Sequence, residues 1–412
     1  MISNRCSLQN KGIIPKLLSQ HGAVLSGDQA VIDLSTAENW FLKEKLLQTF
    51  ANGADRLAIS GADLSYAEGI GGDATTRRML ARLLNDQFNP ANSVDPSHIV
   101  LAAGGSFALS ALLGQICNPG DGVLIAAPYW PGLDICFTVH NEVTAVPVHV
   151  PLEDFFGASS IPRYEEALRS ARVPVKAVFV CNPHNPLGQC YPKETLEVIL
   201  DFCKHHNLHY ISNEVYALSQ HQIEVDVDGP PPFVSVLSLE PQSDIVHVLY
   251  SLSKDFGANG IRAGAVITVN DQIRLSCALS AHSQVSTMAT WIATKLILRE
   301  ENVHRVVNEG QKDLKHAYTT IERFLTQRKL TFIPATCGQF VFVKLLASGE
   351  RKDESNLSQV LSRNAVAVSS GASYHCNEAG WYRICYAVPR ATLEEGLGRI
   401  EKSLAEYGVA SK

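Results

Sequence analysis

The sequence predicts an α/β protein in which a large domain with a mostly parallel seven-stranded sheet is joined to a smaller α+β domain. Three observations support this prediction. Short apolar runs rich in β-branched residues recur seven times, segments of helical character lie between them, and the pattern changes after about residue 270. The seven runs are residues 99–103, 123–127, 143–148, 177–181, 208–212, 245–250 and 263–269. Because these runs are apolar throughout, we expect strands buried on both faces, with helices covering the sheet.

A chain of 412 residues exceeds one typical hydrophobic core, so two domains are expected. After the seven runs come long helical stretches at 271–327, two strand-like runs at 339–343 and 382–386, and a final helix from about Thr392. The first forty residues precede the sheet and hold no complete βαβ unit, so they are assigned to the same part as the C-terminal region. The predicted domains are 46–285 for the large one, and 1–45 with 286–412 for the small one.

Composition limits the expected partners and location. Apolar residues make up 46% and charged residues 18% of the chain, and the formal net charge is -6, so neither nucleic acid nor a membrane is an expected partner. The ten cysteines are scattered singly without a C-x-x-C pair, and the N-terminus has no apolar signal segment, which favours a cytoplasmic protein with reduced thiols. The uncharged stretch 99–116 is interrupted by Gly104-Gly105-Ser106, which predicts a strand, a turn and a packed helix rather than a membrane span.

Polar and glycine-rich segments follow the predicted strands at their carboxyl ends, where ligands bind in such sheets. Among them, Lys254 carries the strongest signal because it comes shortly after the buried run 245–250. Partial desolvation there would lower its pKa and free the amine to form a Schiff base with a carbonyl cofactor. An ordinary exposed lysine is the alternative for this residue taken alone.

Other residues at the same strand ends are suited to a phosphate. A helix that opens at a glycine turn offers N–H groups to an anion, and hydroxyl and guanidinium groups donate to one. The residues concerned are Gly105, Ser106, Ser251, Ser253 and Arg262. A carbonyl-binding lysine beside a phosphate site indicates pyridoxal phosphate as the cofactor.

Taken in order, these motifs resemble those of the fold type I pyridoxal phosphate enzymes, in particular the class I and II aminotransferases and their 1-aminocyclopropane-1-carboxylate (ACC) synthase-like branch. The resemblance covers residues 37–386. It implies that Lys254 holds the cofactor and then acts as the base at the substrate Cα. It also implies that Trp130 stacks on the cofactor ring, and that Asn185 and Tyr216 bind the ring oxygen. The resemblance assigns phosphate binding to Gly105, Ser106, Ser251, Ser253 and Arg262.

Three further positions match the family. Arg383 matches the arginine that binds the substrate α-carboxylate through two parallel hydrogen bonds. Glu38, within Ala37-Glu38-Asn39-Trp40, matches the ACC synthase-like branch, as does the run 371–378, and it is assigned to substrate binding. Tyr66 matches a tyrosine that reaches the phosphate of a partner subunit, so a homodimer is expected.

Asn213 departs from the family. The family has aspartate beside the pyridine nitrogen of the cofactor, whereas this chain has Asn213-Glu214-Val215-Tyr216. A neutral amide binds that nitrogen more weakly than a carboxylate, so the nitrogen is expected to lose its proton and the cofactor to become a weaker electron sink. This favours elimination of a leaving group over full transamination.

Three functions stay open. The first is an aminotransferase-family enzyme acting on an α-amino acid or an intermediate derived from one. The second is an ACC synthase-like or carbon–sulfur lyase that eliminates a group at Cβ or Cγ in specialised metabolism, and the third is a cofactor-binding pseudoenzyme.

No metal is expected, because the histidine pair His205 and His209 has no glutamate between its members. Gly69-Ile70-Gly71-Gly72 has no strand before it, which argues against a dinucleotide loop.

Overall fold

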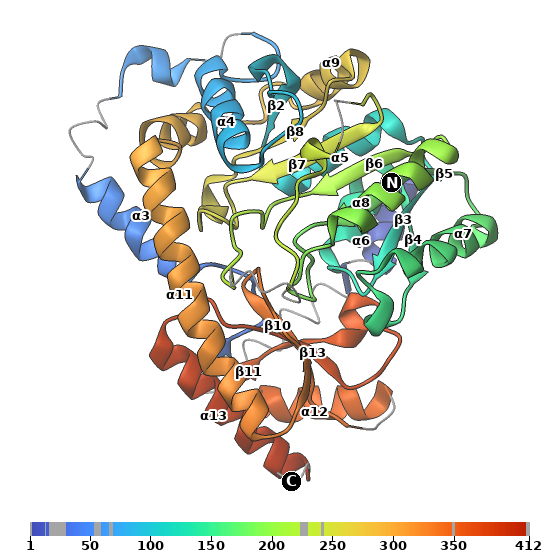
Figure 1. Cartoon of the computed structure of the whole chain (residues 1–412), viewed down its shortest axis with the longest axis vertical. Coiled ribbons are helices and arrows are strands. Elements are labelled where there is room, and N and C mark those ends of the chain that lie inside the picture. The colour runs from blue at the N-terminus through green and yellow to red at the C-terminus, as the bar shows by residue number, and fades with distance from the viewer. Residues whose placement is uncertain are drawn as a thin grey trace.

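The computed structural model describes residues 2–12, 14–15, 30–52, 59–65, 69–222, 230–239, 243–347 and 351–408. All seven predicted strands form one sheet with the order β2-β8-β7-β6-β5-β3-β4 (Figure 1). They are β2 (Ile99–Ala102), β3 (Gly122–Ala127), β4 (Thr144–His149), β5 (Val175–Cys181), β6 (His209–Asn213), β7 (Val246–Ser251) and β8 (Gly264–Ile267). The predicted α/β class and mostly parallel sheet are confirmed.

One strand runs against the others. β8 pairs antiparallel with both β2 and β7, while β7, β6, β5, β3 and β4 pair in parallel. The parallel register sets Cys181 of β5 opposite Asn213 of β6, and Asn213 opposite Leu249 of β7. Because parallel strands end at the same edge, the residues that follow β5, β6 and β7 meet there.

Helices cover both faces of this sheet, as the apolar runs predicted. Successive strand residues alternate between two cores: Leu101 and Val178 pack on one face, and Val100 and Ala177 on the other. The first face is covered by α4 (Ala74–Gln87), α7 (Ile161–Ser170) and α8 (Lys193–His205), and the second by α5 (Gly105–Ile116), α6 (Gly132–Asn141) and α9 (Asp271–Ser280). The predicted helix opening at Gly105 is confirmed by α5.

The C-terminal part contains a four-stranded sheet with the order β12-β13-β10-β9, drawn below the large sheet in Figure 1. Its strands are β9 (Thr331–Ile333), β10 (Phe340–Lys344), β12 (Ser369–Ser370) and β13 (Trp381–Cys385), and helices α12 (Arg351–Arg363) and α13 (Arg390–Tyr407) pack beside it around a second core. β1 (Ile32–Asp33) pairs in parallel with β11 (Val366–Ala367), so the N-terminal segment lies with the C-terminal one.

Helix α11 (Glu300–Gln327) connects the two parts along one side of the molecule (Figure 1). Val303 and Val306 pack in the core of the large sheet, whereas Leu314 and Ile321 pack in the second core. The division at residue 285 stays a prediction. The other helical elements are α1 (Asn4–Lys11), α3 (Trp40–Asn52), η2 (Gly61–Leu64), η3 (Pro96–His98), η4 (Leu152–Asp154), η5 (Ala158–Ser160), η6 (Val236–Ser238), η7 (Asn259–Ile261), α10 (Thr287–Ile292), η8 (Ala293–Ile297) and η9 (Gly371–Tyr374).

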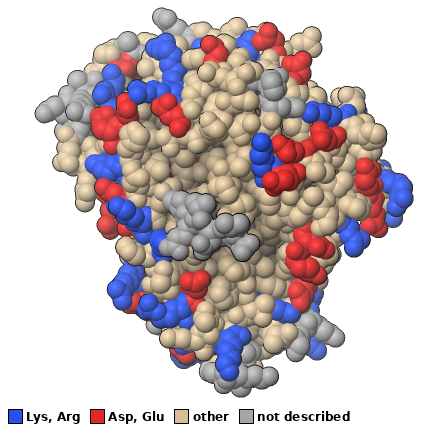
Figure 2. Space-filling view, in the orientation of Figure 1, with Lys and Arg blue, Asp and Glu red and all other residues tan. Residues whose placement is uncertain are grey.

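The surface and the helices carry two findings about partners. On the face in Figure 2, acidic and basic side chains are interspersed and neither sign covers a large continuous area. Within the described ranges, no helix combines the length and the apolar character needed to cross a membrane.

Candidate active site

A cavity of about 990 Å³ lies between the carboxyl edge of the large sheet and the small-domain sheet. Its volume is at the upper end of the range of ligand sites. Among the described residues, every site residue predicted from the sequence lines it, except Glu38. These lining residues are Gly105, Ser106, Trp130, Asn185, Asn213, Tyr216, Ser251, Ser253, Lys254, Arg262 and Arg383. Tyr66 lies outside the described residues, so its predicted role stays a prediction.

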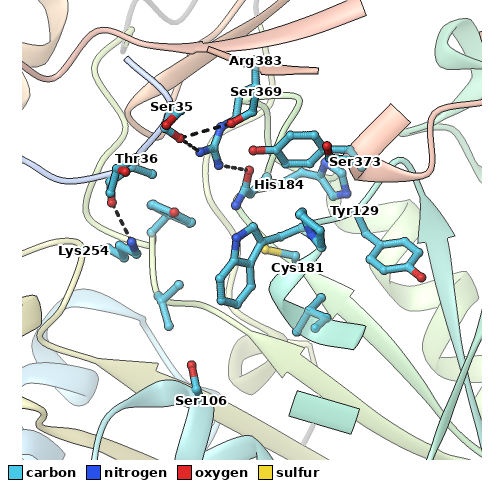
Figure 3. A pocket seen from close by; sticks show the side chains of 18 of the residues that line it. Ser35, Thr36, Ser106, Tyr129, Cys181, His184, Lys254, Ser369, Ser373 and Arg383 are labelled. Carbon is cyan, nitrogen blue, oxygen red and sulfur yellow. Dashed lines mark hydrogen bonds between the residues drawn. The ribbon is translucent and has the colours of Figure 1, made fainter. Parts of the chain in front are cut away.

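Lys254 lies in the turn that follows β7, and its amine reaches toward the N-terminal segment. Nζ donates a hydrogen bond to the backbone oxygen of Ala37 at 2.6 Å (Figure 3). Burial lowers the pKa of this amine to about 8, and the positive charge of Arg383 acts in the same direction. A substantial fraction is therefore neutral near physiological pH, as a nucleophile or a base requires.

Glycines form the end of the cavity at the N-terminus of α5. Gly104 has φ +86°, and a Cβ placed there would lie 2.1 Å from Nη2 of Arg262. A Cβ on Gly264 would lie 2.6 Å from the backbone carbon of Gly104. Arg262 itself has φ 60° and donates to the backbone oxygens of Asn259 at 2.7 Å and Ala103 at 3.2 Å. The absence of side chains at both glycines lets the guanidinium lie against the opening turn of the helix.

The strands bring hydroxyl groups to the same place. Gly264 pairs with Ala102 on one side and with Ser251 on the other, so three adjacent strands meet there. Ser251 and Ser253 are both buried and both line the cavity. A helix N-terminus, a guanidinium and hydroxyls form a donor set that fits a phosphate.

Arg383 of β13 lies at the other end of the cavity (Figure 3). Its Nη1 donates to Oδ1 of Asn185 at 2.9 Å, and its Nη2 donates to the backbone oxygen of Ser35. The guanidinium carbon is 5.0 Å from the ring centre of Phe340 and 5.1 Å from that of Tyr374. The side chain is 3% exposed and held by these four groups, so its fork is fixed in orientation, as binding a carboxylate requires.

Asn213 and Cys181 end neighbouring strands in the middle of the cavity. Nδ2 of Asn213 lies 3.8 Å from Sγ of Cys181, which is within the range of a weak hydrogen bond to sulfur. Burial raises the pKa of the Cys181 thiol to about 12, so the thiol stays protonated at neutral pH. This pair therefore presents no negative charge to the cavity.

Glu214, the carboxylate next to Asn213, serves a different purpose. Oε1 accepts hydrogen bonds from Ser212 Oγ at 2.8 Å and from the Val236 N–H at 2.9 Å, and Oε2 accepts one from Ser235 Oγ at 2.6 Å. Glu214 is fully buried and is not a lining residue. It anchors the segment at η6 and does not take the place of the missing aspartate.

Aromatic side chains complete the walls. Tyr216 packs edge-to-face on Phe340 with ring centres 5.4 Å apart, and burial raises the pKa of its phenol well above the usual value, so it remains a neutral donor. Trp130 is 38% exposed, and its indole lies against Gly132, where a Cβ would come within 2.2 Å of the ring. Trp130 therefore lines the cavity with one edge in solvent.

Asp134 joins the two parts of the chain beside Trp130. Its Oδ1 accepts a hydrogen bond from the Tyr129 hydroxyl at 2.9 Å, and its Oδ2 lies 2.8 Å from Nε2 of His375. The rings of Tyr129 and His375 stack with centres 4.4 Å apart. These contacts hold η9 against the start of α6, over one wall of the cavity.

Glu38 lies near the site without lining it. Its Oε1 accepts a hydrogen bond from Asn259 Nδ2 at 2.7 Å, and its Oε2 pairs with Lys43. Its assignment to substrate binding stays a prediction. His209, one member of the histidine pair noted in the sequence, has its Nδ1 3.0 Å from Nε2 of His247. Across the described ranges, no group of three histidine, cysteine or acidic side chains is arranged to hold a metal.

Sequence reasoning missed several residues of the site, among them Ser35, Ala37 and Cys181. Ser35 and Ala37 contribute backbone oxygens, which leave no signal in the side-chain pattern. Cys181 was detectable in principle, because it is the last residue of a predicted strand, and strand ends are where ligands bind.

The chain matches known proteins along most of its length. The family "Aminotransferase class I and II" matches residues 29–400. The probable aminotransferase tcpI of Claviceps purpurea (strain 20.1) is 51% identical over 412 residues, covering 99% of this chain and 97% of that protein. 1-Aminocyclopropane-1-carboxylate synthase 1 of Oryza sativa subsp. indica is 30% identical over 401 residues, covering 91% of this chain and 81% of that protein.

Solved structures agree on the fold. A single mutant of Thermus thermophilus aspartate aminotransferase superimposes with a TM-score of 0.77 at 22% identity, covering 98% of this chain and 99% of that one. At this identity the likeness establishes the fold alone, which is the predicted fold type I architecture. The family match and the relatives indicate an enzyme of the aminotransferase or lyase type, and the chain belongs to the class I and II aminotransferase family.

Proposed function

We propose that this protein is a pyridoxal phosphate enzyme that acts on the amino group and Cα of an α-amino acid. One observation carries the proposal: the buried amine of Lys254, with its pKa lowered to about 8, lies between an anion cradle and a fixed arginine fork. The amine suits the carbonyl of the cofactor, the anion site suits the phosphate of the cofactor, and the guanidinium suits the carboxylate of the substrate.

The residues fit the cofactor. The cradle at Gly104 and Gly264 leaves room that a Cβ would fill, and Arg262, Ser251 and the N-terminus of α5 supply donors for the phosphate. Lys254 supplies the amine for the carbonyl. Pyridoxal phosphate, when bound, withdraws electrons from the substrate Cα and so makes its proton acidic.

The chain's own residues then position the substrate and move a proton. Arg383 binds the α-carboxylate, which fixes Cα in relation to Lys254. The neutral Nζ of Lys254 takes the proton from Cα and becomes an ammonium group. In transamination Lys254 returns this proton to another carbon, whereas in elimination a group leaves from Cβ or Cγ with the electron pair.

The second candidate is the lyase, and the pair of Asn213 and Cys181 favours it. The cavity has an amide and a protonated thiol where the family has a carboxylate, so positive charge on the ring nitrogen is not stabilised there. Elimination tolerates this better, because charge at Cα leaves with the departing group. A similarity to an ACC synthase supports the same alternative.

The cofactor assignment is tested by trapping. Borohydride reduction of the enzyme with pyridoxal phosphate should attach the cofactor to the peptide that contains Lys254. The same treatment without borohydride is the control, since the bond then reverses. A label on another lysine, or no visible absorbance after reconstitution, would refute the assignment.

The reaction is tested by product analysis on a panel of amino acids. A keto acid with a matching amino product indicates transamination, while ammonia or pyruvate with a released thiol indicates a lyase. Absence of turnover with a fully loaded enzyme would favour the pseudoenzyme.

We also propose a homodimer in the cytoplasm. Tyr66 is the basis for the dimer, and sedimentation should give twice the mass of one chain. The scattered cysteines support the location. A fully active monomer, or unchanged cofactor affinity in Tyr66→Phe, would contradict the proposed contribution of Tyr66.

A further inference from the structure

Gln339 links the small-domain sheet to the backbone of Lys254. It directly precedes β10, its side chain is fully buried, and Nε2 donates a hydrogen bond to the backbone oxygen of Lys254 at 3.0 Å. The same oxygen accepts a hydrogen bond from the Gly257 N–H at 3.2 Å. The peptide group that follows the lysine is therefore held from two sides, once by its own turn and once from the other part of the chain.

Gly338, the residue before Gln339, makes a second connection between the small-domain sheet and a loop of the large domain. The N–H of Gly338 donates to Oγ of Ser219 at 2.8 Å, and that hydroxyl donates to the backbone oxygen of Tyr216 at 2.5 Å. Two consecutive residues before β10 thus contact the two loops that carry Tyr216 and Lys254. The small domain and these loops are expected to move together.

Asp255 connects the two loops to each other. Its Oδ2 accepts hydrogen bonds from the Leu218 N–H at 3.1 Å and from the Tyr250 hydroxyl at 3.0 Å. This contact lies within the large domain and does not involve Gln339. Removal of the Gln339 contact therefore leaves this connection within the large domain in place.

Stability alone does not account for a glutamine at this position. Its Oε1 is buried and has no hydrogen-bond partner among the described residues. A buried carbonyl oxygen without a partner is destabilising, because it has lost its hydrogen bonds to water. A methionine of similar length would avoid this cost, so the hydrogen bond to Lys254 is the feature that explains the amide.

We propose that Gln339 is a positioning residue for Lys254, holding the peptide group of the lysine so that its amine stays buried and aimed at the cavity. Release of this contact gives the amine access to water, which favours the charged form and raises its pKa from about 8 toward the usual 10.5. The consequence for proton transfer at Cα rests on the proposed function, but the consequence for the amine itself does not.

Four charged or titratable groups act on this amine. They are Arg383 and Cys385 on β13, Glu38 before α3, and Arg262 after η7. Substitution of Gln339 by methionine or leucine leaves all four in the chain and adds no charge. A change in the lysine pKa then reports its placement rather than a new electrostatic neighbour.

The test measures the reactivity of the Lys254 amine in the full-length chain freed of cofactor. Acetic anhydride at limiting amount, followed by peptide analysis across pH 6–10, gives the fraction of free amine at each pH. Relative to the reactivity of the same variant at pH 10, where access alone sets the rate, Gln339→Met and Gln339→Leu are expected to lower the reactivity at pH 7 by about three- to tenfold, because each unit of pKa rise lowers the free-amine fraction tenfold below both pKa values.

Gln311→Met is the matched control. Gln311 also donates its side-chain amide to a loop carbonyl, that of Leu218 at 3.1 Å, but it does not contact Lys254. Wild-type reactivity in this control together with reduced reactivity in both Gln339 variants supports the proposal. Unchanged reactivity in the Gln339 variants, equal loss in the control, or failure of both Gln339 variants to fold overturns it.

A second readout follows proton transfer. With Cα-deuterated substrate, the isotope effect on kcat should rise in Gln339→Met while KM changes little, since removal of the Cα proton becomes slower. If wild-type Lys254 forms no borohydride-stable bond with pyridoxal phosphate, the proposed function fails. The labelling experiment still decides the role of Gln339 in that case.

Discussion

The two ends of the cavity are built in different ways. The phosphate end takes Ala102, Ser251 and Gly264 from three adjacent strands of one sheet, together with the turn that opens α5. The carboxylate end takes Ser35, Asn185 and Arg383 from segments far apart in the sequence. Figure 3 shows Arg383 and Ser35 at one end, Ser106 at the other, and Lys254 and Cys181 between them.

Because of this difference, the two ends should respond to different kinds of substitution. Glycine geometry and strand register form the phosphate end locally, so backbone substitutions should disturb it. Docking of β13 and the N-terminal segment onto the loop of Asn185 forms the carboxylate end, so loss of side-chain hydrogen bonds should disturb that end instead. A substitution at one end is therefore expected to spare the other end.

Lys254 lies between the ends, and its loss has the largest expected effect. Lys254→Ala should lower turnover by about 100- to 10,000-fold, because no other group replaces the base. It should also abolish borohydride trapping of the cofactor. In the wild type, cofactor capture should become faster as pH rises through about 8, where the amine loses its proton.

Lys43→Ala is the control for Lys254. Lys43 pairs with Glu38 and does not line the cavity, so this variant should keep turnover and trapping near wild type. If borohydride still trapped the cofactor in Lys254→Ala, the assignment of Lys254 as the residue that binds the cofactor would be wrong.

Arg383→Lys tests the carboxylate end. A lysine offers a point charge in place of the fork that bonds Asn185 and Ser35, so KM for the amino acid should rise about 10- to 100-fold. Affinity for the cofactor, measured by its absorbance on titration, should change little. Arg328→Lys serves as the control, since that guanidinium stacks on Phe324 away from the cavity. Equal losses of cofactor and substrate binding would contradict the separation of the two ends.

Gly104→Ala tests the phosphate end. The positive φ of +86° with ψ 169° and the 2.1 Å approach to Arg262 leave no room for a methyl group, so cofactor affinity should fall about tenfold, at a strain of about 1–3 kcal/mol. With saturating cofactor, KM for the amino acid should stay near wild type.

Gly260→Ala is the control for Gly104→Ala. A Cβ at Gly260 meets nothing within 4 Å, so this variant should behave as wild type.

Asn213→Asp has the smallest expected effect and concerns the middle of the cavity. The added carboxylate should raise the pKa of the bound cofactor's ring nitrogen, seen in a spectrophotometric titration. The ratio of keto acid to elimination product should then rise several-fold, since one pKa unit corresponds to about 1.4 kcal/mol. Robust two-step transamination in the wild type, unimproved by the aspartate, would argue against elimination.

The sequence allowed much of the fold to be predicted because burial leaves a local signature. The run at 177–181 became β5, and the glycine turn before Ser106 became the start of α5. The strand ends also indicated where Lys254 and Asn213 would lie, since the carboxyl edge of a parallel sheet is a property of its topology. In each case the observed element lies within two residues of the predicted one.

Other features were out of reach of sequence reasoning. The hydrogen bonds of the Glu38 carboxylate with Asn259 and Lys43 join segments distant in sequence, and the assignment of Glu38 to substrate binding stays a prediction. The partners of Arg383 and Lys254 include the carbonyls of Ser35 and Ala37, and every residue has such a carbonyl. Only the position of the N-terminal segment against the rest of the chain selects these two.

The sequence by itself thus determined the sheet, the turn at Gly104 and the order of the reactive residues, because apolar periodicity and glycine placement act over a few neighbouring residues. The tertiary structure alone decided the burial of Lys254, its contact with Gln339 and the fixed fork of Arg383. These features depend on two parts of the chain packing against each other, and desolvation and hydrogen-bond geometry arise only when segments distant in sequence come within a few ångströms.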